Sequence, residues 1–116
     1  MKITSSLAFI LSILIILISC SKGGSGNNPT ACDGVANKAY AADVAPLIQT
    51  FCNQSACHNA GSTNGPGPLT NYAEVFNARS NIRGQVQAGL MPQNSTLTTA
   101  QRNTIICWID AGAPNN

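Results

Sequence analysis

Residues 52–69 constrain the fold of this chain more than any other segment, because they combine two cysteines and the single histidine with several glycines and prolines. The segment has neither helical nor strand periodicity, and its glycines and prolines are typical of a loop. So long a loop is uncommon inside a small domain unless something organises it. The sequence therefore predicts that a disulfide, a metal or a cofactor orders this segment.

The composition supports the same expectation. The chain has 116 residues, of which 5% are aromatic and 9% charged, so we expect one domain with a thin core. Small domains of this kind often depend on a covalent staple or a bound group, and five cysteines and one histidine are available here. A formal net charge of +2 without a Lys/Arg cluster argues against nucleic-acid binding.

The N-terminus has the pattern of an export signal. Lys2 precedes an apolar run at residues 7–18, which is shorter than the roughly 20 residues that a membrane span needs. Cys20 follows directly after Leu-Ile-Ser, an order that resembles the lipobox of bacterial lipoproteins. We predict a signal peptide at residues 1–19 and lipidation at Cys20. An ordinary signal peptide and an uncleaved membrane anchor are the alternatives.

Residues 20–31 are rich in Gly, Ser and Asn and are predicted to form a flexible tether. About 11 such residues give a root-mean-square reach of roughly 18 Å. The folded domain is then expected at residues 32–116, in the oxidising cell envelope, facing the periplasm or the cell exterior. Ser21 after the lipidated cysteine favours the outer membrane over the inner one, by analogy with other lipoproteins.

The domain is predicted to be all-α, with about four short helices and long loops, since no useful β-alternation occurs. Helices are expected at residues 40–51, 72–78, 81–88 and 99–111. The expected N-terminal caps are Asp43, Asn71 with Glu74, Ser80, and Thr98 with Gln101. Gly89 and Gly112 are expected to end the helices that precede them.

Cys52, Cys57 and His58 form the main chemical motif. Covalent attachment of haem needs two thiols and an imidazole directly beside the second thiol, and this order of residues provides them. Four residues separate the cysteines here instead of the usual two, so the intervening loop has to bulge. The alternatives are disulfides, a zinc site, which would need a fourth ligand, and a histidine that is merely part of a loop.

Met91 is the candidate for a second iron ligand. It lies in the loop Gly89-Leu90-Met91-Pro92, and it is the only methionine left once the signal peptide is removed. A lone methionine usually fills a core, but haem iron bound by His and Met is typical of electron-transfer cytochromes. We therefore predict His58 and Met91 as axial ligands.

With these residues the sequence resembles the class I cytochrome c family, in particular the small cytochrome domains of bacterial lipoproteins. The matching segments are residues 43–48 leading into Cys52, Cys57-His58, residues 69–72, 89–92, 97–98 and 105–113. The resemblance covers roughly residues 40–114. It implies a cytochrome c-like fold around one covalent haem c and a role in one-electron transfer with redox proteins of the envelope.

The resemblance also implies roles for single residues. Cys52 and Cys57 would carry the haem, His58 and Met91 would ligate the iron, and Leu69 would pack against the macrocycle. Trp108 would pack either against the macrocycle or in the core. The carbonyl of Pro66 or Pro68 would accept a hydrogen bond from the second imidazole nitrogen. Apolar side chains, Leu90 among them, would bury the haem. Arg79, Arg83 and Arg102 would either pair with haem propionates or face solvent.

Cys32 and Cys107 are left over by this assignment and are expected to form a disulfide in an exported protein, the alternative being two buried thiols. With both axial positions filled, the protein would be an electron carrier and not an enzyme. Two other functions remain open at this point. One is a haem-free, disulfide-bonded lipoprotein that binds a partner, and the other is a haem enzyme or sensor from which Met91 dissociates.

Overall fold

The computed structural model describes residues 32–35 and 38–116. This part contains a π-helical turn (η1, Tyr40–Val44) that continues into α1 (Ala45–Phe51), followed by α2 (Tyr72–Gln87) and α3 (Thr99–Asp110). Its helices occur without any strand, so the all-α prediction is confirmed for the described residues. The predicted signal peptide, Cys20 and the tether lie outside these residues.

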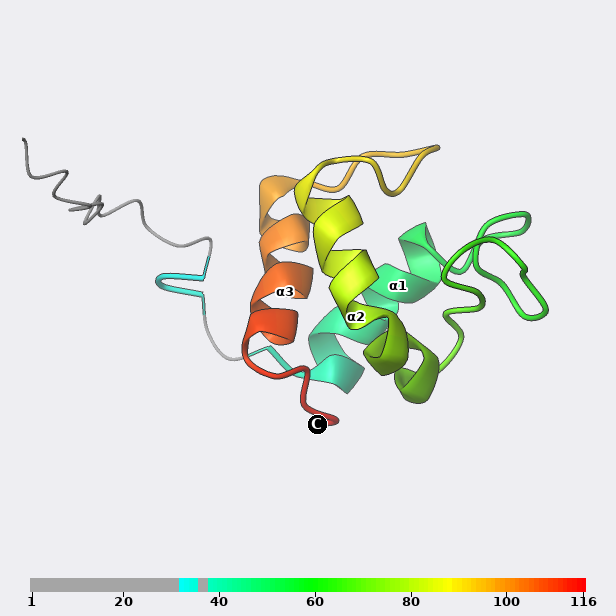
Figure 1. Cartoon of the computed structure of the whole chain (residues 1–116). Helices are drawn as coiled ribbons and strands as arrows, with labels where there is room; N and C mark the ends of the chain where they lie inside the picture. The colour runs from blue at the N-terminus through cyan, green and yellow to red at the C-terminus, as the bar shows by residue number, and fades with distance from the viewer. Residues whose placement is uncertain (1–31, 36–37) are drawn as a thin grey trace, which may run out of the picture.

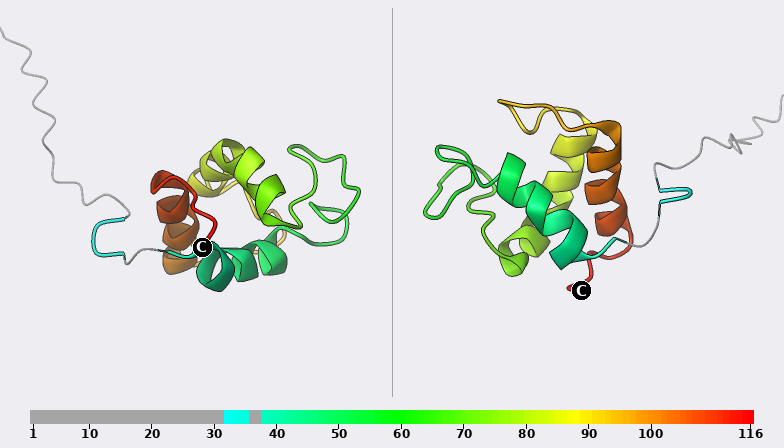
Figure 2. Two further views of the ribbon diagram at one scale, coloured as in Figure 1. Left: turned by 90° about the horizontal axis from the view of Figure 1, so that it is seen from below. Right: turned by 180° about the vertical axis from the view of Figure 1, so that it is seen from behind.

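The helices surround a small core. α2 packs along α3, and η1 packs against both α1 and α3 (Figure 1). Every view shows the loop between α1 and α2 projecting on the side away from α3 (Figure 2). No helix in the described ranges has the length and apolar character needed to cross a membrane.

α2 corrects one prediction, since residues 72–78 and 81–88 form a single helix rather than two. Ser80 lies in the interior of this helix and is not an N-cap. A single serine lowers helix stability only slightly, so it does not interrupt the helix. Burial of Val75, Ala78, Ile82 and Val86 along one face keeps the helix continuous across this position.

The predicted caps are otherwise largely present. Thr98 and Gln101 form both hydrogen bonds of a capping box at the start of α3. The Asn71 side chain accepts from the Glu74 N–H as expected. Asp43 is not an N-cap: it lies inside η1, where its carboxylate accepts from the Ala39 N–H at 2.8 Å.

Aromatic rings hold the C-terminal end of the fold together. Trp108 lies 5.5 Å from Tyr40 and 6.4 Å from Tyr72, measured between ring centroids. Its indole N–H donates to the Pro114 carbonyl and the Tyr72 hydroxyl donates to the Ala113 carbonyl, each at 2.9 Å. The predicted disulfide between Cys32 and Cys107 is present, which ties the segment before η1 to α3.

Glu74 provides a testable pH dependence. Its carboxylate accepts from the N–H and the hydroxyl of Thr70, and the backbone bond is the larger cause of a pKa below the usual range. A lowered carboxyl pKa adds stability that is complete above the ordinary value of about 4.3 and is lost as the pH falls through the lower value of the folded state.

We therefore expect Glu74→Gln to flatten the fall in the free energy of unfolding as the pH drops below about 4.3. Urea unfolding of wild type and variant at several pH values measures this difference. Asn77→Gln, a change on the same helix that removes no charge, is the control and should keep the wild-type profile. Parallel profiles for Glu74→Gln and wild type would contradict the interpretation.

Candidate functional site

A cavity of about 1050 Å³ lies where α1, the loop after it, α2 and the loop after α2 meet. The sequence-predicted residues Cys52, Cys57, His58, Leu69 and Met91 all line it. Phe51 from the end of α1 and the buried Ile82 and Val86 from α2 complete its apolar walls. The fold thus brings Met91 to the same cavity as the segment that contains Cys52, Cys57 and His58.

His58 is held firmly at the base of this cavity. It is buried, with 7% of its surface exposed, and its Nδ1 lies 2.9 Å from the Gly67 carbonyl oxygen. A carbonyl oxygen only accepts hydrogen bonds, so Nδ1 donates, and in the neutral imidazole this leaves the lone pair on Nε2. Backbone bonds from His58 N–H to Cys52 O and from Leu69 N–H to His58 O fix the segment further.

Gly67 replaces the predicted hydrogen-bond acceptor. The expectation named the carbonyl of Pro66 or Pro68, whereas the residue between them makes the contact. Gly67 has φ +103°, a conformation that side chains with a Cβ rarely adopt. The two flanking prolines are therefore positioned around a glycine that turns the backbone toward the imidazole.

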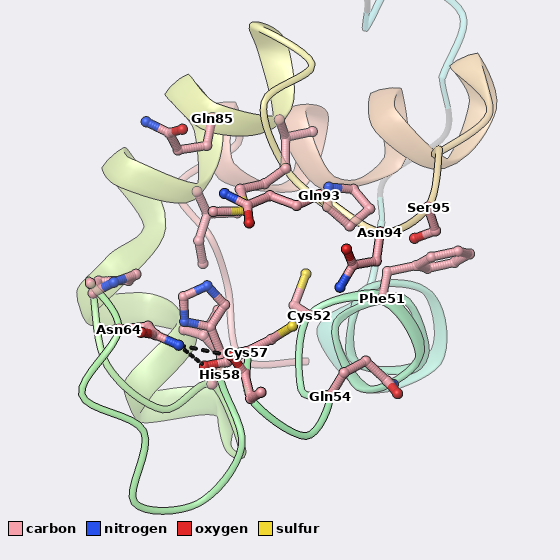
Figure 3. A pocket seen from close by; sticks show the side chains of 18 of the residues that line it. Phe51, Cys52, Gln54, Cys57, His58, Asn64, Gln85, Gln93, Asn94 and Ser95 are labelled. Carbon is pink, nitrogen blue, oxygen red and sulfur yellow. Dashed lines mark hydrogen bonds between the residues drawn. The ribbon is translucent and has the colours of Figure 1, made fainter.

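Cys52 and Cys57 are both free thiols in this structure. Cys52 is buried, and burial, followed by the proximity of Cys57, raises the pKa of its thiol to about 11. Figure 3 shows the two cysteine side chains on the same side of the cavity, with the His58 ring beside them. The described residues contain no group of three or more His, Cys, Asp or Glu side chains placed to hold a metal ion, the arrangement that the zinc alternative requires.

The four residues between the cysteines fold into a compact turn. The Gln54 side chain donates to the Gln49 and Thr50 carbonyls at 3.0 and 2.7 Å, which covers the end of α1. Cys57 N–H closes a turn onto Gln54 O, and Ala56 takes a left-handed backbone conformation with φ +65°. The additional length therefore folds over the end of α1 and does not separate the two thiols across the cavity.

Asn64 also stabilises this turn. Its side-chain amide donates to the carbonyls of Ala56 and Cys57, at 2.9 and 3.1 Å (Figure 3). The Ser62 hydroxyl also donates to the Cys57 carbonyl. Residues 52–64 are thus tied together by side-chain bonds to the backbone, and the attachment motif has a defined shape.

Met91 lies in the loop that crosses from α2 to α3. α2 ends at Gln87, and Gly89 follows it with φ +70°. The N–H groups of Leu90 and Met91 both donate to the Gln85 carbonyl. Met91 is half-buried and lines the cavity, and the chain returns to the core at Leu97. Leu90 differs from its expected role in burying a haem, because it is 60% exposed.

Leu69 and Trp108, the two residues considered for packing against a haem, lie in different parts of the fold. Leu69 is buried against the cavity, as its expected packing role requires. Trp108 is fully buried, but it packs with Tyr40 and Tyr72 and is not among the residues that line the cavity. An indole surrounded by other rings belongs to the core of the fold.

None of the three arginines that were candidates for propionate pairing lines the cavity. Arg83 pairs with Asp110 at 2.6 Å, and the guanidinium of Arg79 lies 3.9 Å from the centre of the Phe76 ring. The Nε atom of Arg102 is buried without a hydrogen-bond partner.

Sequence reasoning missed Asn81, Ile82 and Gln85 as cavity residues. Their positions, together with Val86, follow the helical spacing of i and i+4 on one face of α2, so the signal was present. It was missed because helical spacing alone does not show which face of a helix meets a cavity.

Comparison with protein-family models, with curated proteins and with solved structures finds no match.

Proposed function

We propose that this protein is a single-haem c-type cytochrome that carries out one-electron transfer in the cell envelope. One observation carries the proposal: the two free thiols and the imidazole of residues 52–58 line one cavity together with the thioether of Met91, which is distant in the sequence. A c-type haem uses this combination of groups, with His and Met as axial ligands.

The residues present fit the chemical demands of such a group. The Nδ1 of His58 donates to Gly67 O, which leaves Nε2 available as a ligand and orients the ring. Cys52 and Cys57 are unpaired and close to this ring. Leu69, Ile82 and Val86 provide apolar walls for a flat macrocycle. Ligand cavities commonly measure roughly 300–1,000 Å³, so this one is of adequate size.

The protein's own groups would then do three things. Cys52 and Cys57 would hold the cofactor as thioethers, and His58 and Met91 would fill both axial positions. The Met91 thioether would favour the reduced state and raise the reduction potential. The apolar walls would exclude water. The bound haem supplies the reversible one-electron chemistry.

Filled axial positions support an electron carrier rather than an enzyme, and its partners would be redox proteins of the envelope. The sequence features of residues 1–31 support export, lipidation at Cys20 and a flexible tether. The haem domain would then move above the membrane surface within reach of membrane-bound partners.

An absorption spectrum of the exported protein tests the proposal directly. We expect a c-type Soret and α-band pattern, and we expect the haem to stay with the chain after acid–acetone extraction. A protein that exports and folds without any haem bands would overturn the proposal and favour the haem-free, disulfide-bonded binding module. Carbon monoxide binding to the reduced wild type at neutral pH would instead favour a haem sensor or enzyme.

Replacing Met91 tests the second axial ligand. In Met91→Ala we expect covalent haem to remain, the reduction potential to fall, and carbon monoxide to bind the reduced protein, because the soft thioether ligand is gone. Redox titration and a carbon monoxide difference spectrum measure these changes. Leu90→Ala is a matched control, since its exposed neighbouring side chain does not line the cavity. Equal behaviour of the two variants would exclude Met91 as a ligand.

A further inference from the structure

The cavity has no charged wall. Its described lining residues include no Lys, Arg, Asp or Glu. Polar contacts there come from carboxamides and hydroxyls, which belong to Thr50, Gln54, Ser55, Asn64, Asn81, Gln85, Gln93, Asn94 and Ser95. A haem carries two carboxylate arms, so these arms would meet no cationic side chain in this cavity.

The carboxamides differ in how far they are already used. The side-chain N–H groups of Gln54 and Asn64 already donate to backbone carbonyls of α1 and of the turn between the two cysteines. Asn81, Gln85, Gln93 and Asn94 are all exposed, and none of these side chains makes a hydrogen bond in the described part of the chain. Their donors are therefore available to a ligand.

Asn81 and Gln85 also lie on the side of the cavity where the carboxylate arms of a haem are expected. They are four residues apart on α2 and so share one helix face, next to the buried wall residues Ile82 and Val86. Figure 3 shows Gln85 on α2 across the cavity from Cys52. In a c-type haem the two carboxylate arms leave the ring on the side away from the two carbons bound to cysteine. This edge would therefore face α2.

We propose that the side-chain amides of Asn81 and Gln85 bind the haem carboxylates, which remain without a neutralising cation. The assignment rests on the proposed function. Amide N–H groups are good donors to a carboxylate but add no positive charge. The two negative charges then stabilise the oxidised iron and lower the reduction potential compared with a site where arginine pairs with them.

Gln85→Arg in the haem-loaded protein tests this charge balance. A cation beside the carboxylates is expected to shift the equilibrium toward the reduced form by about tenfold, which corresponds to about 59 mV for one electron. Ala73→Arg, which adds the same charge at an exposed position of α2 outside this cavity and two turns before Asn81, is the control and should shift it much less. Equal shifts in both variants would overturn the assignment.

The ionic strength dependence of the wild-type potential is a second measurement that needs no variant. Uncompensated carboxylates at an open edge are screened by salt, so the potential should rise as salt is added. A potential that does not change with salt would also overturn the assignment. Absence of covalent haem in the wild type would mean that the proposed function fails, which is a different outcome from haem-loaded protein with unshifted potentials.

Discussion

Replacing Cys52 and Cys57 together by alanine is expected to remove all covalently bound haem from the exported protein. The two thiols are free, lie on the same side of the cavity and adjoin the imidazole of His58. Without them no thioether can form, and any haem that still enters the cavity depends on axial ligation alone. Acid–acetone extraction followed by mass measurement of the intact chain separates these cases.

The single variants provide the matched controls for that experiment. The turn between the cysteines is compact and held by Gln54 and Asn64, so we expect both thiols to reach the macrocycle. Cys52→Ala and Cys57→Ala should each retain haem through one thioether. If one single variant loses its haem and the other retains it in full, a single cysteine makes the attachment. Retention of covalent haem in the double variant would exclude both.

Local signals in the sequence predicted the N-terminal caps of α2 and α3 and the glycine after α2, but they failed at Asp43 and Ser80. The capping box at Thr98 and Gln101 involves neighbouring residues only, and the glycine at position 89 is needed at a backbone conformation that other residues avoid. Such features depend on residues within one turn of each other. They can therefore be predicted from a single sequence.

Other features of the site depend on tertiary packing and were missed. The continuity of α2 through Ser80 follows from burial of Ala78 and Ile82 on its core face, which no local preference of serine reveals. The helical spacing of Asn81, Ile82 and Gln85 places them on one face of α2, but only the packing of the helices turns that face toward the cavity. The choice of Gly67 as partner of His58 depends on the backbone path of a loop, for which the sequence has no periodic signal.

The position of Trp108 also depends on tertiary packing that the sequence does not show. Its position beside Cys107 in a segment that resembles a cytochrome c domain suggested contact with the cofactor. In the fold its ring joins Tyr40 and Tyr72, and its N–H bonds to Pro114. Whether α3 reaches the cavity is decided by how the helices pack, and no residue of α3 lines it.

The disulfide between Cys32 and Cys107 is expected to contribute a large part of the stability. It joins residues 75 positions apart, and closing so long a loop restricts the unfolded chain by about 4 kcal/mol in the chain-entropy model. Whole domains are stable by only about 5–15 kcal/mol. The combined change Cys32→Ser with Cys107→Ala should therefore lower the free energy of unfolding by about 4 kcal/mol in urea titrations.

Single replacement of Cys32 by serine isolates the bond from the side chains. It breaks the cross-link but leaves the buried Cys107 in place, so a loss equal to that of the double variant assigns the effect to the bond. Neither cysteine lines the cavity, and the ring cluster around Trp108 still holds α3 to η1. The haem spectrum of the folded variant should therefore match the wild type, while its unfolding midpoint moves to much lower urea. A loss below about 1 kcal/mol would show that the unfolded chain is already compact enough for the cross-link to add little.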